Sequence, residues 1–349
     1  MSGAGGRAFL VALWFAATAV GARAAGLPER LSETGLYADA AAKQLAPDVV
    51  SFTSQYPLWS DGAAKRRWIR IPPGSAIDAA DPNAWIFPVG TRVWKEFSFA
   101  RRVETRYIEL APEGWIFATY RWLSDESDAV LAGERGERAV YEIAPGVSYD
   151  LPGRWDCRAC HEGNVARLLG FSALQLSGDR DGGAPHAEIG GPTDLDLAAA
   201  VARGLVRGLP AELVVHPPRI EAASAHERAT LGYLHANCSN CHNSRGPLAA
   251  LGLSLEVRVD PSGAARSEAL ATTLGKKASY RPSGSPDLIR LVVGDPAASL
   301  LLRRMSRRDN LTQMPPLGSK LVDREAIALV STWIRDEISM THFPEEGKP

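Results

Sequence analysis

A doubled cysteine motif constrains this chain of 349 residues more than any other feature. Residues 157–161 read Cys-Arg-Ala-Cys-His and residues 238–242 read Cys-Ser-Asn-Cys-His, so the two copies have the same spacing and together use all four cysteines. No cysteine remains for a structural disulfide elsewhere in the chain. A chain of this length has enough residues to form packed cores without stabilising disulfide bonds. The paired cysteines and their histidines therefore require another explanation.

The spacing suits covalent attachment of haem. Two thiols three positions apart can each add to one of the two vinyl groups of a haem, and the histidine that follows can then coordinate the iron from the proximal side. We therefore expect two covalently attached haem c groups. The residues expected to hold them are Cys157, Cys160, His161, Cys238, Cys241 and His242. A zinc site and a pair of redox dithiols are the alternatives, because Cys-x-x-Cys serves both.

The first residues predict an export signal. Arg7 precedes an apolar run over residues 8–22, and residues 22–24 read Ala-Arg-Ala, a small-x-small cleavage site. We expect a signal peptide over residues 1–24 and a periplasmic protein, which favours haem because c-type haem is attached after export. The apolar run is shorter than the roughly 20 residues that a membrane-spanning helix needs. No membrane span is therefore expected once the signal is removed.

Charge and composition narrow the function classes. The whole chain has a formal net charge of −1, which becomes −3 without Arg7 and Arg23, the only charged residues of the expected signal. This balance argues against a nucleic-acid partner. The composition is that of an ordinary globular protein, and the length predicts about two domains at roughly 150 residues each.

Residues 25–150 are expected to form a β-rich sandwich or barrel-like module. Aromatic and β-branched residues dominate four segments, which Pro and Gly turns separate. The predicted strands cover residues 68–71, 93–99, 103–110 and 115–122. Six tryptophans of this region, Trp59, Trp68, Trp85, Trp94, Trp115 and Trp122, predict an aromatic core.

The second half is expected to be a mainly α, cytochrome c-type haem region. A first haem segment (151–223) precedes a domain with the second haem (224–349). Helices are predicted over residues 194–208, 224–237 and 299–305 and after Asp323. The capping box from Ser224 to Glu227 should start a helix that runs directly into Cys238.

Met314 is the expected distal ligand of the second haem. Pro315 and Pro316 follow it and remove backbone donors, so the loop should stay extended and present the thioether with little freedom to lose. Met305 lies in a leucine-rich helical stretch and Met340 in the C-terminal tail, so packing or surface roles are expected for both.

These motifs carry a resemblance to known families. Residues 233–242, 294–296 and 313–318 resemble a class I cytochrome c domain. The chain after the signal resembles an uncharacterised family of bacterial dihaem c-type cytochromes that place a β-rich module ahead of the haem region. The resemblance implies haem c attachment at both motifs and His/Met ligation of the second iron. It implies no particular reaction.

The sixth ligand of the first haem is less well specified. No methionine occurs between Cys160 and Met305, so this position is a histidine, another group, a residue of the other domain, or open. His186, in the Gly/Pro-rich loop 182–192, is the first choice. His235, one helical turn before Cys238, is the second.

Electron transfer between periplasmic redox proteins is the function that these features favour. A dihaem peroxidase or oxygenase with an open first haem is the alternative. A third possibility is a cytochrome that the β-rich module docks onto a partner dehydrogenase.

Overall fold

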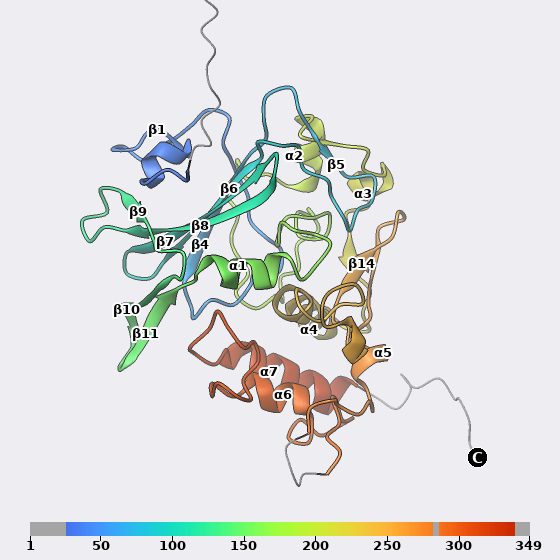
Figure 1. The fold of residues 1–349 in the computed structure, drawn as a ribbon. Coiled ribbons are helices and arrows are strands. Elements are labelled where there is room, and N and C mark those ends of the chain that lie inside the picture. The colour runs from blue at the N-terminus through green and yellow to red at the C-terminus, as the bar shows by residue number, and fades with distance from the viewer. Residues whose placement is uncertain (1–25, 282–285, 339–349) are drawn as a thin grey trace, which may run out of the picture.

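The computed structural model describes residues 26–281 and 286–338 (Figure 1). The expected signal peptide, residues 1–24, and Met340 lie outside the described residues. Within the described ranges, no helix combines the length and the apolar character needed to cross a membrane.

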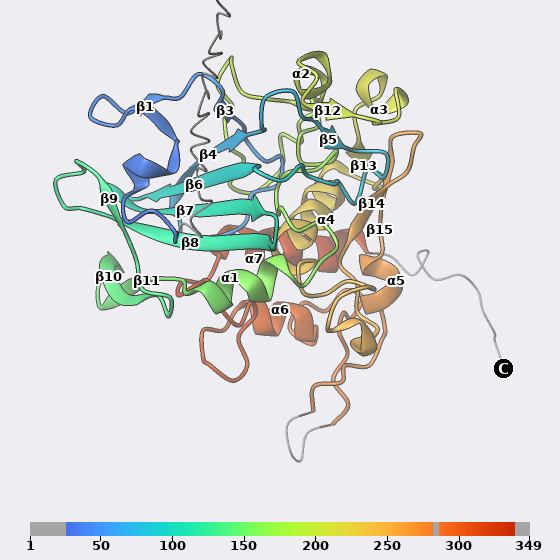
Figure 2. The same ribbon diagram turned by 45° about the horizontal axis from the view of Figure 1, so that its top comes forward.

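A six-stranded antiparallel sheet forms the centre of the N-terminal half (Figure 2). All four predicted strands are confirmed as its long members, and the β-rich character of this region is confirmed with them. Their aromatic and β-branched residues favour the extended backbone. In spatial order the strands are β3 (Val50–Ser51), β4 (Ala64–Arg70), β6 (Arg92–Ser98), β7 (Arg102–Ala111), β8 (Gly114–Trp122) and β9 (Ala129–Leu131).

The sheet is open, and among the described residues it forms neither the expected sandwich nor a barrel. Its faces are covered by other parts of the chain instead of by a second sheet. On one face, Trp68, Trp94 and Trp122 pack with the N-terminal turn η1 (Leu31–Thr34). On the other face, Val93 belongs to a core that extends into the C-terminal half. Both faces are thus buried without sheet-on-sheet packing.

Shorter strands connect the sheet to the rest of the chain. Two pairs form antiparallel hairpins, β5 and β12 pair in parallel although more than 120 residues separate them, and three others form a small sheet. The segment after the first motif therefore returns to the β-rich part. These strands are β1 (Tyr37–Asp39), β2 (Gln44–Leu45), β5 (Ile77–Asp78), β10 (Glu137–Ala144), β11 (Val147–Leu151), β12 (Val206–Arg207), β13 (Arg219–Ile220), β14 (Val257–Val259) and β15 (Ala264–Ser267).

Helices are short and form a minority of the described chain. The predicted starts at Ser224 and Asp323 are confirmed, since their side chains accept hydrogen bonds from Glu227 N at 2.9 Å and Ala326 N at 3.1 Å. Long irregular segments join the helices, so the second half is mixed and not mainly α. The helices are α1 (Arg154–His161), α2 (Leu197–Ala202), α3 (Glu212–Val215), α4 (Ala225–Cys238), η2 (Ala249–Leu251), α5 (Ala269–Thr273), α6 (Leu300–Met305), α7 (Arg324–Thr332) and the π-helical turn η3 (Trp333–Glu337).

One hydrophobic core spans the expected domain boundaries. It contains Phe52 and Ile69 from the β-rich part, Leu176 from residues 151–223, and Leu234 and Trp333 from the C-terminal part. Helix α4 packs against α7 and η3, and α6 packs against α7 (Figure 1). The segments expected at 25–150, 151–223 and 224–349 therefore share buried contacts.

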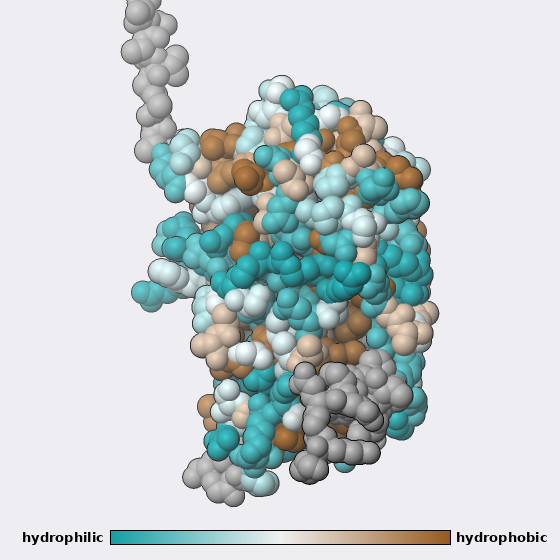
Figure 3. Space-filling view, turned by 90° about the vertical axis from the view of Figure 1, so that its right-hand side faces the viewer, coloured by the Kyte–Doolittle hydropathy of each residue, from teal (hydrophilic) through white to brown (hydrophobic). Residues whose placement is uncertain are grey.

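The surface is mixed on the face that Figure 3 shows. Hydrophilic residues dominate the middle of this face, and hydrophobic residues gather toward its upper end, which in Figure 1 corresponds to the part of the fold that contains α2, α3 and β5. Val215, at the end of α3, is one of the exposed large hydrophobic residues.

Candidate functional site

The first cysteine motif lies on α1, directly after the β10–β11 hairpin. The Asp156 carboxylate accepts a hydrogen bond from Gly153 N at 2.9 Å and so fixes the start of the helix. Gly153 is needed here, because a Cβ atom at this position would lie 2.7 Å from the carbonyl carbon of Arg135. The helix packs against β8, and the ring of His161 at its end lies 5.1 Å from that of Phe117.

His161 has the protonation that a metal-binding imidazole needs. Its Nδ1 lies 2.7 Å from the carbonyl oxygen of Arg167, and since a carbonyl only accepts, Nδ1 carries the proton and donates it. The lone pair is then on Nε2. Burial lowers the pKa of His161 to about 4, which keeps the imidazole neutral. A carbonyl partner that orients a ligating histidine in this way is typical of metal sites.

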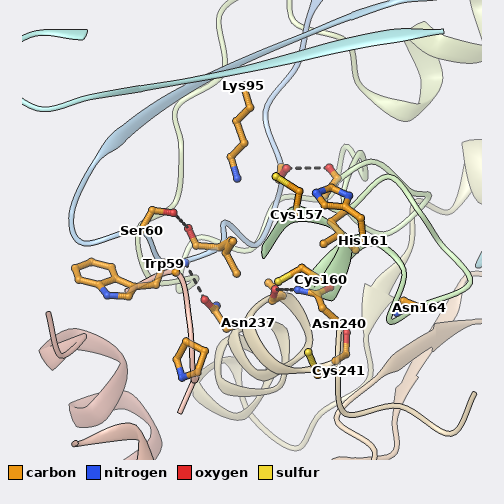
Figure 4. Close-up of a pocket in the computed structure, with 18 of the residues that line it drawn as sticks. Trp59, Ser60, Lys95, Cys157, Cys160, His161, Asn164, Asn237, Asn240 and Cys241 are labelled. Carbon is orange, nitrogen blue, oxygen red and sulfur yellow. Dashed lines mark hydrogen bonds between the residues drawn. The ribbon is translucent and has the colours of Figure 1, made fainter. Parts of the chain in front are cut away.

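A cavity of about 610 Å³ opens beside this motif (Figure 4). Cys157, Cys160 and His161 all line it. The opposite part of its lining includes Val93 and Lys95 of β6, together with residues of β7. The β-rich region therefore contributes a wall of the first candidate site. The volume is within the range of cofactor pockets, about 300–1,000 Å³.

Three basic side chains form a cross-strand row on this wall. Arg67 of β4 pairs in register with Lys95 of β6, which pairs with Arg106 of β7, and all three side chains line the cavity. Arg67 forms an ion pair with Glu188, and Arg106 forms one with Glu104 at 2.7 Å. The sequence analysis missed this row. Its signal in the sequence was a basic residue near the middle of each of three long strands.

The second motif follows α4 without a break. Cys238 is the last residue of the helix, and its carbonyl oxygen accepts a hydrogen bond from His242 N at 2.9 Å. A second cavity of about 420 Å³ is lined by Cys238, Cys241, His242 and Met314. Its apolar lining also includes Leu248, Leu251, Leu253, Leu255, Leu300, Leu301, Met305 and Ile327.

Met314 is held at this cavity by its backbone. Met314 N donates a hydrogen bond to the Arg304 carbonyl oxygen at 3.0 Å, which ties the loop to α6. The side chain of Gln313 donates to the Pro315 carbonyl oxygen at 3.1 Å and braces the same turn. Met305 lines the same cavity and is also a buried residue of the main core, with only 8% of its surface exposed. Both thioethers thus lie near the second motif.

The two cavities share a wall. Asn237, Cys241, Arg308, Pro315 and Pro316 line both of them. The second motif and the Met314 loop therefore separate the two sites by roughly one layer of side chains. Two groups bound in these cavities would lie close together.

The structure does not bring His186 to either motif. His186 Nε2 lies 2.9 Å from Asp323 Oδ2, and Nδ1 lies 3.4 Å from Glu325 Oε2. Its ring also contacts Trp59, with 4.8 Å between the ring centroids, and it lines neither cavity. Both ring nitrogens of His186 face carboxylates because the 182–192 loop packs against the start of α7. The expectation that His186 binds the first iron does not fit this position.

His235 lines the first cavity but presents no free lone pair to it. Val257 N donates a hydrogen bond to His235 Nδ1 at 3.0 Å. Burial lowers the pKa of His235 to about 4, so the ring is neutral. A neutral imidazole that accepts at Nδ1 has its proton on Nε2. In this arrangement neither nitrogen can coordinate a metal.

The four cysteines are free thiols in buried surroundings. Burial raises the pKa of Cys160 to about 11 and that of Cys238 to about 12. A reactive dithiol has at least one lowered pKa, so the redox-dithiol interpretation does not fit these environments. Within residues 26–281 and 286–338, no three His, Cys, Asp or Glu side chains gather closely enough to hold a metal ion. Two thiols and one neutral imidazole beside a cavity are instead the donor set that haem c requires.

Comparisons of the chain with protein-family models, with curated proteins and with solved structures found no match.

Proposed function

We propose that this protein is a dihaem c-type cytochrome that transfers electrons between redox proteins of the periplasm. The observation that carries the proposal is that each of two adjoining cavities is lined by one complete Cys-x-x-Cys-His set. A chance pairing of thiols and histidines would not be expected to produce a cofactor-sized cavity beside both copies.

In the first site, Cys157 and Cys160 would form the thioether bonds and His161 Nε2 would bind the iron. The hydrogen bond from His161 to the Arg167 carbonyl oxygen orients the ring and makes it a stronger donor. Residues of the sheet line the far side of the cavity. This contact gives the β-rich region a role in shaping the site, beside any role in docking a partner.

In the second site, Cys238, Cys241 and His242 would hold the haem and Met314 would be the distal ligand. Three features support the proposed class I cytochrome c character of residues 224–349: the capped helix α4 that ends on the motif, the packing of α7 on α4, and the thioether in the lining. The apolar lining would favour the less charged, reduced form of the iron. Methionine ligation has the same effect, so the second site should have the higher potential.

The shared wall supports electron transfer within the molecule. A haem iron accepts and releases one electron at a time without a change of attachment. Asn237, Cys241 and the Pro315–Pro316 turn hold the two sites at a fixed separation. The protein's own contribution is thus to fix distance, ligands and polarity. Export before haem attachment would place the mature protein in the periplasm, where its partners would be other redox proteins.

A redox titration of the protein matured in a host that attaches haem c tests this function. We expect two one-electron transitions at different potentials, rapid reduction and reoxidation by one-electron mediators, and negligible turnover of hydrogen peroxide. The Cys157→Ala/Cys160→Ala variant should keep only the higher-potential transition. Rapid peroxide turnover by the half-reduced protein would contradict electron carriage and favour the dihaem peroxidase.

A further inference from the structure

Lys95 points into the first cavity. It lies on β6, and Figure 4 shows its side chain extending from the sheet so that the amino group faces the space beside Cys157, Cys160 and His161. The side chain is partly buried, and it lines the cavity. A lysine on the solvent face of a sheet would instead place its amino group in water.

The amino group of Lys95 has no carboxylate partner among the described residues. Its row neighbours Arg67 and Arg106 each have a carboxylate partner, Glu188 and Glu104. Among the described residues, Lys95 Nζ has no hydrogen-bond or ion-pair partner, and it lies 5.0 Å from the centroid of the Phe97 ring. Placing such a group in a cavity without a partner is costly, so a bound group is expected to satisfy it.

The other donors near the first motif are unavailable. His186 is bound to carboxylates outside the cavity, and His235 accepts a hydrogen bond at Nδ1. No methionine lines this cavity in the described part of the chain. Apart from His161, Lys95 is therefore the nitrogen donor in the described lining whose lone pair no other protein group uses.

We infer that Lys95 Nζ would bind the iron of a haem held at the first site, together with His161. The inference rests on the proposed haem attachment and names the distal ligand that the sequence left open. It also gives the contact between the β-rich region and the proposed haem region a role, because strand β6 carries the ligand Lys95.

The electrostatic surroundings are consistent with a neutral amine. Burial lowers the pKa of Lys95 well below its usual value, and the charges of Arg67, Lys65 and Arg106 lower it further, whereas Glu188 opposes them. Coordination requires the unprotonated amine. Lysine adopts this form readily when it is buried, whereas arginine stays protonated.

The alternative role is an ion pair between a charged Lys95 and a haem carboxylate. Lys95→Arg separates the two roles, because a guanidinium keeps the positive charge but has no lone pair to offer. Lys65→Ala is the matched control. Lys65 is a neighbouring lysine whose Nζ donates to the Ala63 carbonyl oxygen at 3.1 Å and which does not line the cavity.

The test is electron paramagnetic resonance and near-infrared magnetic circular dichroism of the oxidised holoprotein. Wild type should give two low-spin haems, one with a histidine–amine and one with a histidine–methionine charge-transfer band. Lys95→Ala and Lys95→Arg should each convert one low-spin signal to high spin and lose the amine band. Lys65→Ala should keep both signals. The methionine band reports that each variant is folded.

If wild-type protein has no covalently attached haem, the proposed function itself is wrong. If two haems are attached, a first haem that is high-spin in wild type, or low-spin in Lys95→Arg, overturns the Lys95 assignment alone. The wild-type near-infrared band decides the question even if no Lys95 variant folds, because bis-histidine and histidine–amine haems have different bands.

Discussion

Asn243 Nδ2 donates a hydrogen bond of 2.9 Å to the carbonyl oxygen of Gly163. Asn243 directly follows the second motif, and Gly163 lies two residues after the first, so this bond joins the two motifs across 80 positions of sequence. Asn243 is fully buried and also donates to the Ser239 carbonyl oxygen at 2.8 Å. The two candidate haem sites are thus parts of one structural unit.

Gly163→Ala should disrupt this junction. A Cβ atom at Gly163 would lie 2.4 Å from the Asn240 carbonyl oxygen, which is backbone and cannot move alone. We expect the free energy of unfolding to fall by about 1–3 kcal/mol, as for other overpacked sites. Denaturant unfolding of the holoprotein measures this. Gly182→Ala is the control, because nothing lies within 4 Å of a Cβ atom there. Equal effects of the two substitutions would refute the close packing of the motifs.

Met314→Ala should remove the sulphur-to-iron charge-transfer band of the oxidised protein. The potential of the second site should fall and that of the first should stay within error, because only the second cavity contains Met314. Spectroelectrochemistry measures both quantities. Met305→Ala tests the competing thioether. It should keep the band while lowering the free energy of unfolding by about 2–5 kcal/mol, because Met305 is in the core. The reverse pattern would assign the ligand to Met305.

His186→Ala should leave the spectra of both haems unchanged and destabilise the fold. The substitution removes the contact between the 182–192 loop and Asp323 at the start of α7, and charge-assisted hydrogen bonds of this kind contribute about 1.5–3 kcal/mol. His216→Ala is the control, since His216 is exposed and its nearest carboxylate, that of Glu212, is 3.8 Å away. A high-spin signal in His186→Ala would restore His186 as the ligand.

The His186 contact should also depend on pH. Burial alone would raise the pKa of Asp323, but hydrogen bonds from His186 and from Ala326 N lower it below its usual value. A carboxyl group with a lowered folded-state pKa contributes stability above its unfolded pKa of about 3.9, and loses it as the pH falls through the folded value. The part of the stability difference between wild type and His186→Ala that comes from the Asp323 carboxylate should therefore be present above about pH 4 and shrink as the pH falls below about 4. A difference that does not change over this range would argue against the ion pair.

Local sequence patterns predicted much of the fold. The four long strands were recognisable from their aromatic and β-branched residues, and the starts of α4 and α7 from Ser224 and Asp323, because strand propensity and helix capping act over a few neighbouring residues. The open sheet was not predictable in this way. What covers Trp68 on one face and Val93 on the other depends on segments far away in sequence.

The same limit applies to the candidate site. Motif spacing identified both cysteine sets and the Met314 loop, because each lies within one short stretch. Lys95 carries no local signal, since its significance comes from pairing β6 with β4 and β7 and from the packing of α1 against the sheet. For His186 the limit acts in the opposite direction: its loop looked able to present a ligand, but the structure places its ring against Asp323 and Glu325, which are more than 130 residues away.

Counting covalently bound haem tests the central claim most directly. The protein is expressed in a host that attaches haem c, denatured, and analysed by intact mass and by the pyridine haemochrome spectrum. We predict two haems per chain in wild type, one in Cys157→Ala/Cys160→Ala and one in Cys238→Ala/Cys241→Ala. Zinc in place of haem, or no haem that survives denaturation, would contradict the account.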